Sequence, residues 1–285
     1  MSQLDEKSLG RRLQTARQKA GLTQQTLCQK AGLSYSTLAK IERGAIKSPS
    51  IFTIQNIAAA LGTSLDELAG IAPIGLAKQR LRSKSGVSFV YFDINGCLVH
   101  FYHRAFTKIA MDCDQPSDVV ESAFWHYNDQ ICRGEMTMDD YNKTLGERLY
   151  LPKFNWSAYY LEVVKPVQHM HELVQWVAQR YGVGLLTNIM PGLVGEMRGH
   201  GLIPDIAYDV IIDSSEVHLL KPERKIYELA IEKAGCPAHE ILFVDDARTN
   251  LMAAEKFGWH VLWFDDLHPE ESAARIREIL EPSEE

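Results

Sequence analysis

Short apolar runs alternate with amphipathic stretches over the last two hundred residues, and this alternation is the feature that most restricts the fold. Strands alternating with helices predict a parallel sheet covered on both faces, with a site at the carboxyl ends of the strands. The predicted strands are residues 87–92, 183–187, 206–212, 241–244 and 260–264. The predicted helices are residues 166–181, 222–234 and 247–257.

Polar side chains of a few chemically related types follow these strands. They are Asp93, Thr187-Asn188, Lys221 and Asp245-Asp246. Phosphoryl transfer through a covalent intermediate requires a carboxylate nucleophile, a cation that offsets the phosphate charge, and donors to the phosphate oxygens. Asp93 is therefore expected to be nucleophile and metal ligand, and Asp245 a second oxygen ligand for Mg²⁺. Thr187 would supply a hydroxyl donor and Lys221 a fixed positive charge.

The same residues resemble the haloacid dehalogenase (HAD) superfamily over residues 87–266. The matching motifs are Asp93, Leu186-Thr187-Asn188, Lys221-Pro222-Glu223 with Ile226-Tyr227, and Phe243-Val244-Asp245-Asp246 with Asn250. The resemblance implies an α/β HAD-like, Rossmann-type domain over residues 87–285, with an inserted α-helical cap at about residues 100–165. It also implies that a phosphate or similar ligand is bound by Thr187, Asn188, Lys221, Asp246 and Asn250.

Asn95 departs from the family pattern. In family phosphatases the residue two positions after the nucleophile is an Asp that protonates the leaving oxygen, and an amide cannot supply that proton. Loss of general acid–base help costs about 10²–10⁴ in rate. The resemblance also implies a metal contact from the backbone carbonyl at this position, which Asn95 retains. We therefore expect Asn95 to weaken catalysis more than metal binding.

The first seventy residues predict a compact all-α unit of five helices. The expected helices are residues 8–20, 24–31, 35–43, 50–61 and 64–68, with Thr23 and Ser34 as N-caps of the second and third. Two short helices joined by Ala31-Gly32-Leu33 form a helix-turn-helix by spacing. Phrases such as Leu22-Thr23-Gln24-Gln25 and Leu38-Ala39-Lys40-Ile41-Glu42 resemble the phage-repressor (Cro-like, Xre-type) family.

This resemblance implies a DNA-binding domain over residues 1–70 whose third helix lies in the major groove. Base contacts are expected from the exposed side of that helix, and backbone contacts from its flanks. The DNA-binding candidates are Gln24, Ser34, Tyr35, Ser36, Thr37, Lys40, Arg43 and Lys47. Since one unit contacts little DNA, a homodimer on a palindromic operator of double-stranded DNA is expected.

Charge divides the chain in the same way. Residues 1–86 hold 13 Lys and Arg against 5 Asp and Glu, whereas residues 87–285 hold 17 against 32. The basic part suits a polyanion partner. Residues 71–86 are expected to form a basic linker, either solvated or following the DNA backbone. No run approaches the roughly 20 apolar residues of a membrane span, so no membrane partner and a cytoplasmic location are expected.

Three functions are compatible with this sequence. The first is a transcriptional regulator whose HAD-like domain binds Mg²⁺ and a phosphorylated or anionic small molecule, with catalysis weakened by Asn95. The second is an active Mg²⁺-dependent phosphatase that uses its DNA-binding domain for autoregulation or tethering. The third is a regulator in which the HAD-like domain is only a dimerisation or partner-binding body.

Overall fold

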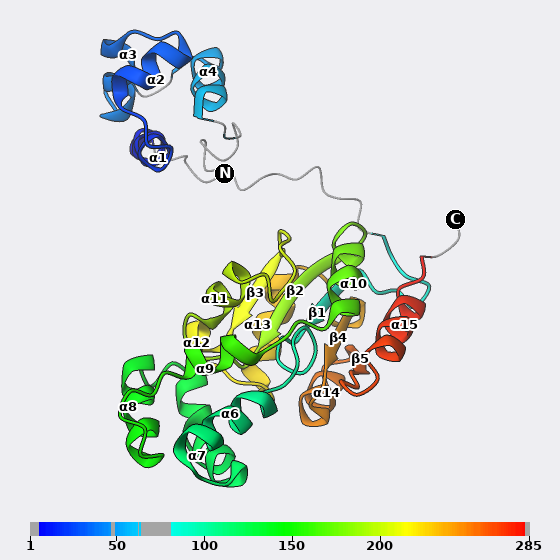
Figure 1. The fold of residues 1–285 in the computed structure, drawn as a ribbon. Helices are drawn as coiled ribbons and strands as arrows, with labels where there is room; N and C mark the ends of the chain where they lie inside the picture. The colour runs from blue at the N-terminus through cyan, green and yellow to red at the C-terminus, as the bar shows by residue number, and fades with distance from the viewer. Residues whose placement is uncertain (1–5, 47–48, 62, 64–80, 283–285) are drawn as a thin grey trace. The chain divides into compact units, whose positions relative to one another are not determined.

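The computed structural model describes residues 6–46, 49–61, 63 and 81–282. The chain divides into two compact units, Met1–Lys78 and Gln79–Glu285 (Figure 1). The fifth helix predicted at residues 64–68, Lys47, and residues 71–80 of the predicted linker lie outside the described residues.

The first unit is helical, as predicted. Its described helices are α1 (Glu6–Lys19), α2 (Gln24–Ala31), α3 (Tyr35–Glu42) and α4 (Ile51–Leu61). Thr23 and Ser34 accept hydrogen bonds from the backbone N–H groups of Thr26 and Thr37, which confirms both predicted N-caps. Gly32 ends α2 in the left-handed conformation, φ 65°, which a glycine adopts without steric cost. The helices enclose a small core that includes Leu13, Leu27, Leu38 and Ile57.

The second unit is built on a parallel five-stranded sheet in the order β3-β2-β1-β4-β5 (Figure 1). The strands are β1 (Phe89–Phe92), β2 (Gly182–Thr187), β3 (Val210–Asp213), β4 (Ile241–Asp245) and β5 (His260–Trp263). The order places β1 between β2 and β4. The carboxyl ends of these three strands therefore lie side by side, where the predicted site residues are found.

Helices cover both faces of the sheet, and the side chains of β1 alternate between two hydrophobic cores. Val90 and Phe92 join the core formed with α10 (Gln168–Ala178), α11 (Leu193–Gly199) and α15 (Pro269–Ile279). Phe89 and Tyr91 join the core formed with α13 (Arg224–Ala234) and α14 (Arg248–Glu255). Two short helical turns, α12 (Ser214–Val217) and η1 (Ala238–Glu240), complete the connections. A sheet buried on both faces explains why its strands are apolar throughout.

The insertion after β1 is an α-helical cap, as predicted. It consists of α6 (His103–Cys113), α7 (Ser117–Cys132), α8 (Met138–Arg148) and α9 (Trp156–Val163). Many of its aromatic side chains pack on one another rather than facing solvent; the buried ones include Tyr102, Phe106, Phe124, Trp156 and Tyr160. No helix in the described ranges is long and apolar enough to cross a membrane.

Some element boundaries differ from the sequence prediction. β3 begins at Val210 rather than at residue 206, because Asp209 pairs with the start of β2: its carboxylate accepts from Val183 N–H and its N–H donates to Val183 C=O. The end of the predicted linker also belongs to the second unit. Leu81 N–H donates to Arg180 C=O, and Arg82 and Lys84 form ion pairs with Glu240 and Glu281.

Candidate functional site

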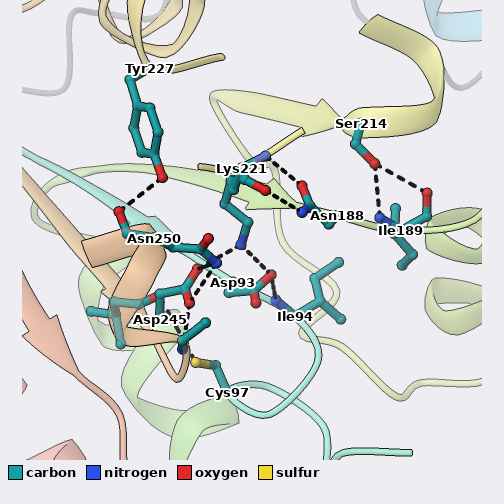
Figure 2. Close-up of polar contacts among 12 residues, drawn as sticks. Asp93, Ile94, Cys97, Asn188, Ile189, Ser214, Lys221, Tyr227, Asp245 and Asn250 are labelled. Carbon is teal, nitrogen blue, oxygen red and sulfur yellow. Dashed lines mark hydrogen bonds and ion pairs between the residues drawn. The ribbon is translucent and has the colours of Figure 1, made fainter. Parts of the chain in front are cut away.

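Lys221 joins the ends of β1 and β4. Its ammonium Nζ lies 2.9 Å from Oδ1 of Asp93 and 2.6 Å from Oδ2 of Asp245, and all three side chains are buried (Figure 2). The sequence prediction that these residues converge is correct. Burial of two carboxylates with one ammonium is tolerated because the ion pairs are short and further hydrogen bonds hold the groups.

Those further hydrogen bonds fix both Lys221 and Asp245 (Figure 2). Asn188 receives the backbone N–H of Lys221 on Oδ1 and donates Nδ2–H to its carbonyl, each at 2.8 Å. Asn250 donates Nδ2–H to both carboxylate oxygens of Asp245, at 3.0 and 3.1 Å. The N–H of Ala247 donates to Asp245 Oδ1 at 2.8 Å. Asn188 and Asn250, predicted as ligand-binding residues, thus also position Lys221 and Asp245.

Asp246 occupies a different environment from its neighbour. It lines a cavity of about 240 Å³ beside Asp93, and within the described residues its carboxylate makes no hydrogen bond to another residue. Gly96, at φ 85°, passes so close that a Cβ there would lie 2.2 Å from Asp246 Oδ2. The glycine therefore lets the loop after β1 approach this carboxylate, which faces the cavity while Asp245 is bonded to protein.

Three carboxylates, Asp93, Asp245 and Asp246, offer oxygen atoms that all lie within 4.8 Å of one another. Burial, opposed by Lys221, raises the pKa of Asp93 to about 6. Burial and the nearby Asp93 and Asp245 raise the pKa of Asp246 to about 7. Clustered acids that resist ionisation fit a divalent cation with oxygen ligands, because the cation offsets their mutual repulsion.

Thr187, at the end of β2, has a fully buried hydroxyl without a hydrogen-bond partner in the described part of the chain. A buried polar atom in this state costs free energy unless a ligand or water satisfies it. The position next to Asp93 and Lys221 makes this hydroxyl available to a phosphate oxygen. Donor, cation and carboxylates together form a cradle for a metal-bound phosphate.

Asn95 is held by the cap. The hydroxyl of Tyr160 in α9 donates to Asn95 Oδ1 at 2.6 Å, and both side chains are buried. With Oδ1 occupied, the amide nitrogen is the group left to face a ligand, and it is a hydrogen-bond donor. The pairing spans 65 positions in the sequence, and no local pattern announces it.

The cap also forms a wall of the cavity that the sequence identifies only in part. Phe101, Tyr102, Trp125 and Asn128 line it opposite the strand ends. All four lie within residues 100–165, the segment predicted to form the cap, but no motif singles out Phe101 or Asn128.

In the first unit, a buried ion pair braces the helix-turn-helix. The guanidinium of Arg17 in α1 donates to both oxygens of Glu42 in α3, at 2.7 and 3.1 Å. Gln24, at the start of α2, donates Nε2–H to Glu42 Oε2 at 2.7 Å. Three helices are thereby tied at one carboxylate, and Gln24 connects α2 to the helix predicted to read DNA.

The predicted base-reading side chains lie on the solvent side of α3. Tyr35 is 56% exposed although it is a large aromatic residue, and Ser36 and Lys40 are exposed beside it. Ser34 and Thr37 share a hydrogen bond between their side chains at the start of the helix. Arg43 is exposed and donates Nε–H to the carbonyl of Ala39.

Comparison with known proteins identifies both units. A haloacid dehalogenase-like hydrolase family model matches residues 88–258, and a helix-turn-helix family model matches residues 13–68. The chain therefore belongs to the haloacid dehalogenase-like hydrolases and carries a helix-turn-helix domain.

Individual relatives are distant. The chain is 26% identical over 171 residues to the sesquiterpene phosphatase astK of Aspergillus oryzae (strain ATCC 42149 / RIB 40), covering 59% of this chain and 84% of the relative. It is 22% identical over 203 residues to mouse acyl-CoA dehydrogenase family member 10, covering 67% of this chain but only 19% of that longer protein.

Among solved structures, the second unit is similar to a HAD family enzyme from Bacteroides thetaiotaomicron crystallised with magnesium and inorganic phosphate. The TM-score is 0.54 at 18% identity, covering 64% of this chain and 96% of that one. This similarity supports the HAD fold.

Proposed function

We propose that this protein is a sequence-specific DNA-binding regulator whose HAD-like domain binds Mg²⁺ and a phosphorylated or otherwise anionic small molecule. The observation that carries this proposal is the state of the phosphate cradle. Lys221, Thr187 and the carboxylates are all in place, whereas position 95 presents an amide pinned by Tyr160 instead of an acid. Such a site holds a phosphate better than it releases a leaving group.

DNA recognition is assigned to α3. Tyr35, Ser36 and Lys40 project from its solvent side and suit contacts with base edges in the major groove. Thr37, Arg43 and Lys47 are assigned to the phosphate backbone, and Gln24 keeps α2 and α3 in register through Glu42. We propose a homodimer on a palindromic operator, because one unit of this size contacts too few base pairs for specificity.

The ligand site is assigned to the strand ends. Asp93 and Asp246, with the backbone carbonyl of Asn95, would hold Mg²⁺, which offsets the phosphate charge when bound. Asp245, first expected to be a metal ligand, is assigned the task of holding Lys221, since its oxygens already accept from Lys221, Asn250 and Ala247. Lys221 and Thr187 would bind the phosphate oxygens.

Operator binding with and without ligand tests the regulator. An operator selected from random DNA is titrated with the full chain in the presence of Mg²⁺ and inorganic phosphate or a panel of phosphorylated metabolites. A ligand-dependent change in operator affinity is expected, and Lys221→Ala should abolish the change without altering affinity in the absence of ligand. Unchanged affinity with every ligand would refute the sensor assignment.

The DNA-reading assignment has its own measurement. Tyr35→Ala combined with Ser36→Ala should reduce the ratio of operator to random-DNA affinity by about 1–3 kcal/mol per lost base contact. Lys40→Ala or Arg43→Ala should flatten the salt dependence of binding by about one unit of slope each if the cation meets a phosphate. Unchanged discrimination in the Tyr35 and Ser36 variant would refute α3 as the reading helix.

A phosphatase is the second candidate, favoured by Asp93 itself. The carboxylate lines the cavity next to Lys221, in position to attack a bound phosphate. Turnover of an aryl phosphate with Mg²⁺, lost in Asp93→Asn, would support this function.

A further inference from the structure

We propose that the site selects phosphate monoesters of a small, planar, uncharged group that leaves as a stable anion, such as an aryl or enol phosphate. This inference rests on the proposed phosphate site and concerns the part of the ligand beyond the phosphate. Three independent features of the cavity lead to it: a flat aromatic wall, the distribution of cations, and the amide at position 95.

The aromatic wall is built by Phe101 and Trp125. Their rings stack at a centroid distance of 6.1 Å and an interplanar angle of 19°, and both line the cavity. Trp125 is 44% exposed, which is unusual for so large an apolar side chain, and its indole N–H is held by Glu121 one turn earlier in α7. A fixed, partly exposed ring face beside a phosphate cradle suits stacking against a planar ligand.

The distribution of charge excludes a second anionic group on the ligand. Of the described residues lining the cavity, Lys221 alone is cationic, and it is already bonded to Asp93 and Asp245 at the phosphate end. The cap wall offers aromatic rings and one amide, Asn128, which follows Trp125 by three positions on the same face of α7. A carboxylate or second phosphate there would be desolvated without a partner. A volume of about 240 Å³ also limits the ligand to a small group.

Position 95 restricts the leaving group. In turnover, an oxygen of Asp93 forms a bond to phosphorus while the P–O bond to the organic group breaks, and the bonding electrons stay on the departing oxygen. The Asn95 amide, fixed by Tyr160, can donate a hydrogen bond to that oxygen but cannot protonate it. The leaving group must therefore be stable as an aryloxide or enolate. Water then cleaves the aspartyl phosphate, both of its hydrogens leave on H₂PO₄⁻, and the Asp93 carboxylate is restored.

Phosphonates, which resist hydrolysis, test the selectivity by calorimetry on the full chain with Mg²⁺. Phenylphosphonate should bind about tenfold more tightly than methylphosphonate, and 4-carboxyphenylphosphonate should lose that gain. Trp125→Ala should remove the preference for the phenyl group while leaving the affinity for inorganic phosphate unchanged, and Trp125→Phe should keep most of it. Met111→Ala, which removes an exposed side chain of α6 away from the cavity, serves as the matched control.

The outcomes separate the two proposals. Failure to bind both Mg²⁺ and inorganic phosphate would overturn the proposed function and this inference with it. Binding of phosphate without preference for the phenyl group, or equal binding of the carboxyphenyl compound, would overturn only the inference. A preference that persists in Trp125→Ala would also overturn the assignment of the wall.

Discussion

At the scale of single residues, Asn95 separates ligand binding from turnover. Its Oδ1 accepts from Tyr160, so its amide nitrogen is directed to the ligand as a donor without an acidic proton. Asn95→Asp should therefore raise hydrolysis of an alkyl phosphate, which needs protonation of its leaving oxygen, by about 10²-fold. Hydrolysis of 4-nitrophenyl phosphate should rise much less, because 4-nitrophenolate leaves without a proton.

Steady-state kinetics with the two substrates checks this expectation. The double variant Asp93→Asn, Asn95→Asp controls for a contaminating phosphatase, since it lacks the nucleophile. An equal gain on both substrates would show that the substitution acts on something other than protonation of the leaving group.

Glu42 is the residue on which the first unit depends. It is buried and accepts from both Arg17 and Gln24. Glu42→Ala leaves the Arg17 charge buried without a partner, which typically costs about 3–5 kcal/mol. Far-UV circular dichroism in urea should show earlier loss of part of the helical signal. Tryptophan fluorescence should be unaffected, because all five Trp residues lie in the second unit.

At the scale of elements, α1 approaches α3 through Gly10. A Cβ at this position would lie 2.6 Å from the Ile41 carbonyl oxygen and 2.7 Å from that of Glu42, so Gly10→Ala must push the two helices apart. Destabilisation of the first unit is expected, although alanine favours helices. Gly195 in α11 provides the matched control, since a Cβ added there would meet no atom within 4 Å and Gly195→Ala should stabilise the second unit by about 0.5–1 kcal/mol. Denaturation followed by circular dichroism and tryptophan fluorescence distinguishes the units, and a neutral Gly10→Ala would contradict the close packing.

The elements also show which parts of the fold a sequence can predict. Caps such as Thr23 and Ser34 act within three residues, so their sequence signals and the observed hydrogen bonds agree. Adjacent strand-end acids are harder, because Asp245 and Asp246 are chemically identical and only the fold directs one to Lys221 and the other to the cavity. The contact of Tyr160 with Asn95 depends on how the cap packs, which no spacing along the chain encodes.

At the scale of the whole molecule, the chain combines a basic unit with an acidic one that concentrates carboxylates at its site. Burial holds the pKa of Asp93 at about 6 and that of Asp246 at about 7, above the ordinary value of about 3.8 in the unfolded chain. Between about pH 4 and 7 the folded state therefore binds more protons than the unfolded state. Linkage then requires these two groups to lower the stability of the second unit as pH rises through this range.

Mg²⁺ should reverse this loss, because it binds the ionised carboxylates of the folded state. The midpoint of the thermal transition reported by tryptophan fluorescence should rise more with Mg²⁺ at pH 7.5 than at pH 5. Asp246→Asn should reduce both the metal effect and the decline in stability with pH, whereas Asp205→Asn, which changes an exposed acid of the same unit, should leave both intact. If Mg²⁺ stabilised the protein equally at the two pH values, proton release from Asp93 and Asp246 could not be coupled to metal binding.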